Sequence, residues 1–127
     1  MQEIAEDYTE LIANIIEAKG MARVCDVSRE MGISHVSVLR TLKRLVRDGY
    51  LLKGEETGIT LTSKGEEMAT LSKKKHTVLT AFLRKLGVPE HIASIDVEGL
   101  EHYISHTTLY AIEEHLKVLQ QSEESHC

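Results

Sequence analysis

The sequence predicts a mainly helical protein, with an N-terminal winged helix-turn-helix domain over residues 1–71 and a helical domain over residues 72–127. Three observations predict this fold class. Apolar residues recur with helical spacing along most of the chain, and the period changes to that of two short strands after Gly49. A long helical pattern from Ser63 to Leu86 then links the two domains.

The N-terminal part of the chain contains three helical patterns. The first covers residues 3–19 and ends before Gly20, and the second covers Ala22–Gly32. The third begins after Ser34, a good capping residue, and continues to about Asp48 with basic side chains outside its apolar face. Two helices joined by a short turn, the second one basic, are typical of a helix-turn-helix.

A hairpin and a long helix follow. Leu51–Lys53 and Ile59–Thr62 are predicted to be strands, and the glycine-bounded segment Gly54–Gly58 is predicted to be the turn between them. A hairpin directly after a recognition helix is a wing. Ser63–Glu66 has the S-x-x-E pattern of a capping box, which predicts the start of a long linking helix that stops at Gly87.

The C-terminal part contains three shorter helical patterns, over Pro89–Asp96, Val97–Ser105 and His106–Gln120. Its polar end, Gln121–Cys127, is expected to be disordered. The helical patterns contain more apolar residues than so short a domain can bury, which predicts a subunit interface and a homodimer. These residues include Ile92, Ile95, Leu100, Ile104, Leu109, Ile112, Leu116 and Leu119.

Composition limits the class of protein. There is no run of about 18 apolar residues and no signal-peptide pattern, so we expect a cytoplasmic protein with no membrane partner. Cys25 and Cys127 are too few and too far apart for a zinc ribbon. We expect both to be reduced thiols, with Cys25 semi-buried and Cys127 on a frayed terminus.

Charge is segregated along the chain. Residues 1–18 contain five acidic and no basic side chains, residues 19–75 contain twelve basic and seven acidic, and residues 76–127 contain three basic and eight acidic. This pattern predicts a polyanion as the partner of the middle segment and a cation as the partner of the ends. The run Lys73–Lys75 is either a solvated helix face or a set of phosphate contacts.

The segment Asp96–His102 contains ligand-type side chains. If it is helical, Glu98, Glu101 and His102 share one face and provide half of a metal site, although a solvated acidic face has the same pattern. On the first helix, two acidic residues lie three positions apart, either as further ligands or as a complement to the helix dipole. They are Asp7 and Glu10.

Several motifs in order and spacing carry a family resemblance: Asp7–Glu10, Leu61–Gly65, His76, Leu86–Val88 and Asp96–His102. With them, nearly the whole chain resembles the diphtheria toxin repressor family of metal-dependent transcription regulators, and specifically its manganese transport regulator branch. The resemblance implies a manganese-responsive repressor of metal uptake genes that is not an enzyme. It also implies a homodimer that binds a palindromic operator in double-stranded DNA.

The same resemblance implies two Mn(II) ions per chain, held between the DNA-binding and dimerisation domains. The iron-responsive branch has Met and Cys at the positions of Asp7 and Glu98, and it carries an SH3-like third domain. Carboxylates and imidazoles suit Mn²⁺, whereas sulfur ligands favour softer metals. Tyr103 departs from the His often found after the motif and leaves the ligand set intact. The implied ligands are Asp7, Glu10, His76, Glu98, Glu101 and His102.

The helix-turn-helix predicts which side chains meet DNA. The start of the recognition helix is predicted to read base edges through Ser34, His35, Ser37 and Arg40. Phosphate contacts are predicted for Lys43, Arg44, Lys53 and Lys64. Two alternatives remain open, namely a winged-helix regulator that responds to iron or another signal, and a binuclear metal hydrolase.

Overall fold

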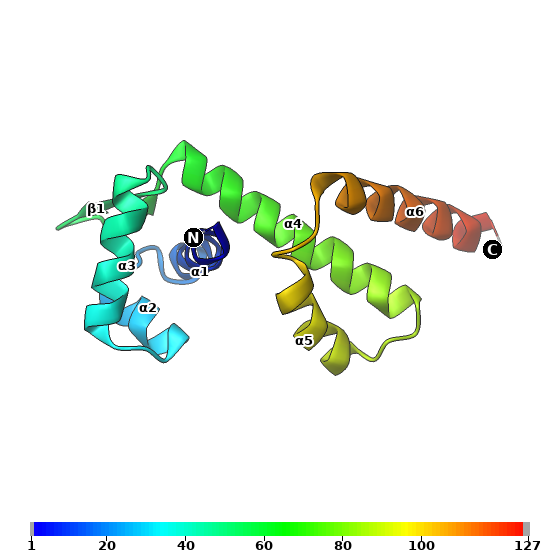
Figure 1. The fold of residues 1–127 in the computed structure, drawn as a ribbon, viewed down its shortest axis with the longest axis horizontal. Helices are drawn as coiled ribbons and strands as arrows, with labels where there is room; N and C mark the ends of the chain where they lie inside the picture. The colour runs from blue at the N-terminus through cyan, green and yellow to red at the C-terminus, as the bar shows by residue number, and fades with distance from the viewer. Residues whose placement is uncertain (1, 126–127) are drawn as a thin grey trace. The chain divides into compact units, whose positions relative to one another are not determined.

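The computed structural model describes the backbone of residues 2–125 and the side chains of residues 3–120. The chain divides into two units, Met1–Ser72 and Lys73–Cys127, which we call the first and the second unit. The predicted domain boundary lies one residue earlier and stays a prediction. The elements of the described chain, in order, are α1 (Gln2–Lys19), α2 (Val24–Met31), α3 (His35–Arg47), β1 (Leu51–Gly54), β2 (Gly58–Leu61), α4 (Ser63–Lys85), α5 (Glu90–Leu100) and α6 (His106–Ser125) (Figure 1).

The first unit is a winged helix-turn-helix, as predicted. Its helices and hairpin bury an apolar core that includes Ile12, Val27, Leu42, Leu45, Leu51 and Ile59. The wing strands are antiparallel, with Leu51 opposite Leu61 and Lys53 opposite Ile59. Ala22, which was predicted to begin the second helix, instead forms a β-bridge with Ile59, so α2 begins at Val24.

Local hydrogen bonds explain where α2 and α3 begin. The Ser34 hydroxyl accepts a hydrogen bond from the Ser37 backbone N–H at 3.1 Å, which confirms Ser34 as the cap of α3. At α2, the Arg23 N–H donates to the Asp26 carboxylate at 3.0 Å. Hydrogen bonds from the Lys19 ammonium and from this N–H lower the pKa of Asp26 below its usual value.

The start of α4 corrects the predicted capping box. The capping oxygen belongs to Thr62, which accepts from the Gly65 N–H at 3.1 Å and also donates to the Gly49 carbonyl at 2.5 Å. Thr62 takes this role because it lies between β2 and the first helical residue, Ser63, where its hydroxyl meets the free N–H groups of the first turn. Gly65 lies so close to the Tyr50 carbonyl that a Cβ there would collide with it.

The second unit consists of the C-terminal part of α4 together with α5 and α6. Its buried apolar residues are Val78, Leu79, Ala93, Val97, Leu109 and Leu116. Lys74 pairs with Glu113 at 3.3 Å, and the Phe82 ring meets His115 edge-on with 6.3 Å between ring centroids. These contacts join α4 to α6.

Two predictions about the second unit were wrong. α5 is continuous across the expected break between Asp96 and Val97, because Ala93 and Val97, one turn apart, are both buried on the same face. α6 continues through Ser125, so the expected disorder from Gln121 onward is wrong up to that residue. The last two residues of that segment lie outside the described residues.

None of the helices in the described part of the chain combines the length and the apolar character needed to cross a bilayer. Cys25 is a free thiol and is exposed rather than semi-buried, because it lies off the face through which Val27 packs into the core. Cys127 lies outside the described residues.

Candidate metal centre and nucleic-acid interface

Three of the predicted ligands meet in the second unit. A carboxylate oxygen of Glu101 lies 3.4 Å from Nδ1 of His76, and the other lies 3.9 Å from Nε2 of His102. The Glu101 and His102 side chains are each only 6% exposed, whereas His76 is 41% exposed. A buried carboxylate therefore lies between two imidazoles, one of which is open to solvent.

The end of α5 places Glu101 and His102. The last helical residue is Leu100, and the His102 N–H then bonds to the Gly99 carbonyl at 3.4 Å, three residues back rather than four. Glu101 itself keeps right-handed helical dihedral angles at the end of the helix. The three side chains differ in burial, since Glu98 is exposed on α5 while Glu101 and His102 are buried. That Glu98 shares one helical face with them stays a prediction.

The cluster has the donor chemistry of a cation site. Carboxylate oxygen and imidazole nitrogen are ligands for Mn²⁺ and other divalent cations of similar hardness, and no sulfur atom takes part in the predicted set. The residues present therefore fit a divalent metal ion.

The basic run beside His76 is not a uniform solvated face. Lys73 and Lys74 are exposed, but Lys75 is only 3% exposed. An ammonium group as deeply buried as this belongs to the interior of the fold. The charge run in the sequence therefore combines two exposed cations with one structural cation.

In the first unit, α1 carries Asp7 and Glu10. Asp7 is exposed and Glu10 is half-buried. The Glu10 carboxylate accepts a hydrogen bond from the hydroxyl of Ser72 on α4 at 2.6 Å, and Ser72 is only 1% exposed. Sequence reasoning missed Ser72, because 62 residues separate it from Glu10 and only the packing of α4 on α1 brings the two together.

The predicted DNA-contacting residues lie on the surface of the first unit. On α3, His35, Arg40 and Lys43 are exposed. Ser34 and Ser37 are exposed too, but their hydroxyls are 3.0 Å apart and bonded to each other, so Ser34 already has a structural role. The remaining predicted contacts, which are also exposed, are Arg44, Lys53 and Lys64.

Lys64 is held in place by its surroundings. Its ammonium group donates to the Asp48 carbonyl at 2.9 Å and lies 4.2 Å from the centre of the Tyr50 ring. A cation–π contact and a hydrogen bond restrict the side chain without neutralising its charge. Lys64 can therefore present a fixed positive charge beside the wing.

Sequence reasoning missed one exposed residue of the recognition helix. Val36, the second residue of α3, is 64% exposed, while Val38 and Leu42 on the opposite face are buried. The signal was present in the helical period, which places Val36 off the core face. In the major groove, an apolar side chain of this kind can contact the methyl group of thymine.

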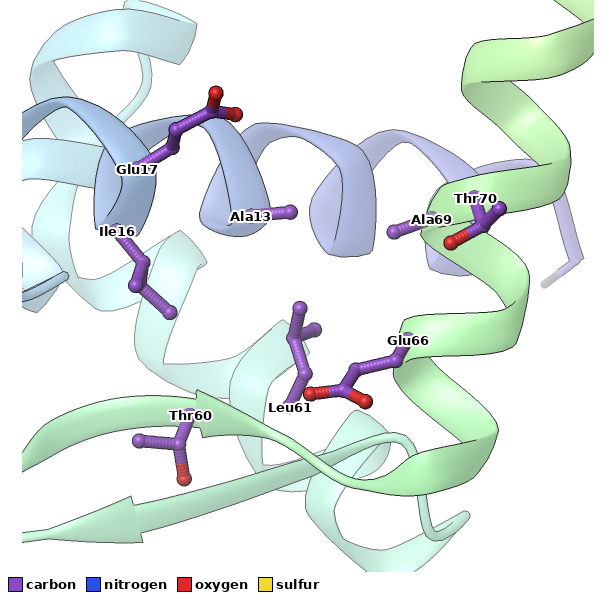
Figure 2. Close-up of a pocket in the computed structure, with 8 residues that line it drawn as sticks. All are labelled: Ala13, Ile16, Glu17, Thr60, Leu61, Glu66, Ala69 and Thr70. Atoms are coloured by element: carbon purple, nitrogen blue, oxygen red, sulfur yellow. The ribbon is translucent and has the colours of Figure 1, made fainter.

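The first unit also contains a groove that is separate from these residues. It has a volume of about 490 Å³. Figure 2 shows Ala13 and Ile16 of α1, Leu61 of β2 and Ala69 of α4 around its apolar part. The complete lining contains none of the predicted metal ligands or DNA contacts, and consists of Ala13, Ile16, Glu17, Thr60, Leu61, Glu66, Ala69 and Thr70.

Comparison with protein families gives two matches that together cover nearly the whole chain. Residues 1–59 match the N-terminal DNA-binding domain of iron-dependent repressors. Residues 62–126 match the metal-binding and dimerisation domain of iron-dependent repressors. The two matches assign the winged helix-turn-helix to DNA binding and the helical part to metal binding and dimerisation.

Individual relatives agree with these matches. The chain is 39% identical to the transcriptional regulator MntR of Escherichia coli over 110 residues, which are 87% of this chain and 71% of the relative. It is 40% identical to the HTH-type transcriptional regulator MntR of Bacillus subtilis over 100 residues, which are 79% of this chain and 70% of the relative.

Solved structures share the fold. The crystal structure of the metal-dependent transcriptional regulator MtsR has a TM-score of 0.84 at 26% identity, covering 92% of this chain and 55% of MtsR. The structure of the manganese regulator SloR has a TM-score of 0.79 at 24% identity, covering 89% of this chain and 53% of SloR. The chain therefore spans about half the length of these two proteins.

Proposed function

Because this chain belongs to the iron-dependent repressor family of metal-dependent DNA-binding regulators, which are not enzymes, we propose that it represses metal uptake genes in response to Mn²⁺. The observation that carries the choice of metal is the donor set. All six proposed ligands offer oxygen or nitrogen, and relatives that are 39% and 40% identical are named MntR. We place the site of action in the cytoplasm, where the DNA is.

The proposed ligands come from both units. Asp7 and Glu10 belong to the first unit, and the second unit contributes His76, Glu98, Glu101 and His102. Bound Mn²⁺, which we propose at two ions per chain, supplies positive charge that offsets the four carboxylates. The histidines coordinate as neutral imidazoles, so the proposal requires them to be deprotonated.

Coordination by ligands from both units restricts how the winged helix-turn-helix is oriented with respect to the dimerisation domain. In a homodimer, this restriction gives the two α3 helices the separation that a palindromic operator demands. By linkage, Mn²⁺ and DNA then raise each other's affinity by the same factor. Exposed apolar residues of the second unit support the dimer, and they include Leu86, Ile92, Ile95 and Leu100.

The test is DNA binding with and without metal. A duplex selected from a random pool in the presence of Mn²⁺ is titrated with the protein at one fixed salt concentration, because phosphate contacts make affinity salt-dependent. Mn²⁺ is expected to tighten binding by about 5- to 150-fold, the usual range of such coupling. A scrambled duplex of the same composition is the control, and equal affinity with and without Mn²⁺ would refute the proposal.

A second experiment separates manganese from iron. The same titration is run anaerobically with Fe²⁺, Co²⁺ and Zn²⁺ for the wild type and for Glu98→Cys combined with Asp7→Met. A thiolate and a thioether favour softer metals, so the double variant is expected to respond more strongly to these ions than the wild type does. A wild type that responds to Fe²⁺ and not to Mn²⁺ would favour the iron-responsive alternative instead.

A further inference from the structure

We infer that Ser72 is a positioning residue for the proposed metal ligand Glu10. Its hydroxyl holds one carboxylate oxygen and leaves the other oxygen available to an ion. The inference rests on the proposed function, in which Glu10 coordinates Mn²⁺. Ser72 does not coordinate the ion itself in this proposal. It acts through Glu10, and no motif in the sequence indicates the contact between the two residues.

The geometry is that of a strong hydrogen bond. The Ser72 Oγ lies 2.6 Å from Oε2 of Glu10. A distance of this size is typical of a hydroxyl that donates to a charged carboxylate, a bond about twice as strong as one between neutral groups. The bond joins α4 to α1 within the first unit, so it orders the carboxylate in the same body that carries Asp7.

Burial makes the contact persistent. Ser72 is 1% exposed, so water has little access to its hydroxyl, while Glu10 is half-buried. An ionised carboxylate has two oxygens and about four acceptor positions. One hydrogen bond to Oε2 therefore leaves Oε1 free to bind an ion and fixes the direction in which it points.

Glu10 has a hydrogen-bond partner that suits a metal ligand, because a buried hydroxyl is bonded to its carboxylate. Groups that orient metal ligands through hydrogen bonds commonly contribute 10- to 100-fold to metal affinity. Because Glu10 has a longer and more flexible side chain than Asp7, it loses more freedom on coordination and gains more from such orientation.

A purely structural role for Ser72 makes a different prediction. If Ser72 serves only to pack α4 against α1, its replacement weakens Mn²⁺ binding to the same extent whether or not Glu10 is present. If it acts through the Glu10 carboxylate, its replacement has no further effect once that carboxylate is gone. A double-mutant cycle distinguishes the two.

The experiment measures Mn²⁺ binding to the full chain, with free Mn²⁺ followed by electron paramagnetic resonance. Ser72→Ala is expected to weaken binding about 10-fold or more, and Glu10→Ala to weaken it further. The double variant is expected to bind as Glu10→Ala does. Ser94→Ala is the matched control. The Ser94 hydroxyl on α5 donates at 2.9 Å to the backbone carbonyl of Glu90 and not to a proposed metal ligand.

Each outcome has a separate meaning. If Glu10→Ala weakens binding but Ser72→Ala leaves it unchanged or tighter, or if the two effects add, the positioning role is overturned and the proposed function stands. If Glu10→Ala itself leaves Mn²⁺ affinity unchanged, the proposed ligand set fails. Should Ser72→Ala not fold in EDTA, Ser72→Thr, which keeps the hydroxyl, decides: wild-type affinity supports the inference, and a loss like that of Glu10→Ala overturns it.

Discussion

The proposed ligands of the first unit and those of the second unit are positioned in different ways. Asp7 and Glu10 lie three residues apart on one continuous helix, so local geometry puts them on neighbouring positions. In contrast, Glu101 and His102 follow the end of α5, and His76 comes from α4. Sequence spacing describes neighbours on one helix, but it does not show that His76 of α4 meets Glu101 at the end of α5.

The largest expected effect contrasts two carboxylates of the second unit. Glu101→Ala is expected to weaken Mn²⁺ binding by about 100-fold or more, since it removes the buried carboxylate between two imidazoles and a lost ligand costs more than a lost outer partner. Glu98→Ala is expected to cost less, because Glu98 is exposed. Isothermal titration calorimetry measures both.

Glu90→Ala is the control for these variants, because Glu90 is an acidic residue of α5 that pairs with Arg84 at 3.3 Å and belongs to no proposed site. Its Mn²⁺ affinity should match that of the wild type. If Glu98→Ala and Glu101→Ala lost the same amount of Mn²⁺ affinity, the burial of a carboxylate would not predict how much it contributes to metal binding.

A smaller effect is expected from two glycines, one in each unit. Gly65→Ala is expected to destabilise the protein by about 1–3 kcal/mol, because its Cβ would collide with the Tyr50 carbonyl and the backbone must move. Gly99→Ala meets open space inside α5 and should stabilise that helix by roughly 0.5–1 kcal/mol. Urea unfolding in EDTA measures the change in unfolding free energy for both variants. The prediction fails unless Gly65→Ala lowers this free energy and Gly99→Ala raises it.

The helix cap at the start of α4 has a smaller effect still. Thr62→Ala removes the oxygen that accepts from the Gly65 N–H, and it is expected to cost about 1 kcal/mol of unfolding free energy. Ser63→Ala tests the capping box that the S-x-x-E pattern predicted, and it should leave stability nearly unchanged. If Ser63→Ala were the more damaging of the two, the assignment of the cap to Thr62 would be wrong.

The smallest expected effect is the dependence of stability on pH at α2. Because hydrogen bonds from Lys19 and from the Arg23 N–H lower the pKa of Asp26 in the folded state, its contribution is present above the unfolded pKa of about 3.8. The contribution is lost as pH falls through the lower folded pKa. Urea unfolding at a series of acidic pH values should show a smaller pH dependence for Asp26→Asn than for the wild type.

Much of the fold follows from the sequence. The helical periods, the stops at Gly20, Gly32 and Gly87, and the change of period after Gly49 predicted the order of elements correctly from α1 through α4. Each of these signals is local, since it depends on residues within one or two turns. The same local character explains why Ser34 was identified as a cap.

The errors occur where distant residues decide the local structure. Thr62 caps α4 while its hydroxyl also bonds to the Gly49 carbonyl, and α5 continues past Asp96 because Ala93 and Val97 are buried together. Lys75 is buried although its neighbours in the run are exposed. In each case the packing of other elements changes the environment of a residue whose own sequence context is ambiguous.

By itself the sequence determined the class of this protein: a winged helix-turn-helix, a long helix and a helical domain with oxygen and nitrogen donors in family order. These features depend on residue type and spacing, both of which are visible in the sequence. Only the tertiary structure decided which donors are buried together, that Glu98 is exposed, and that Ser72 is bonded to Glu10. Burial and hydrogen bonding between distant residues are properties of the packed chain, because they arise only when its helices meet.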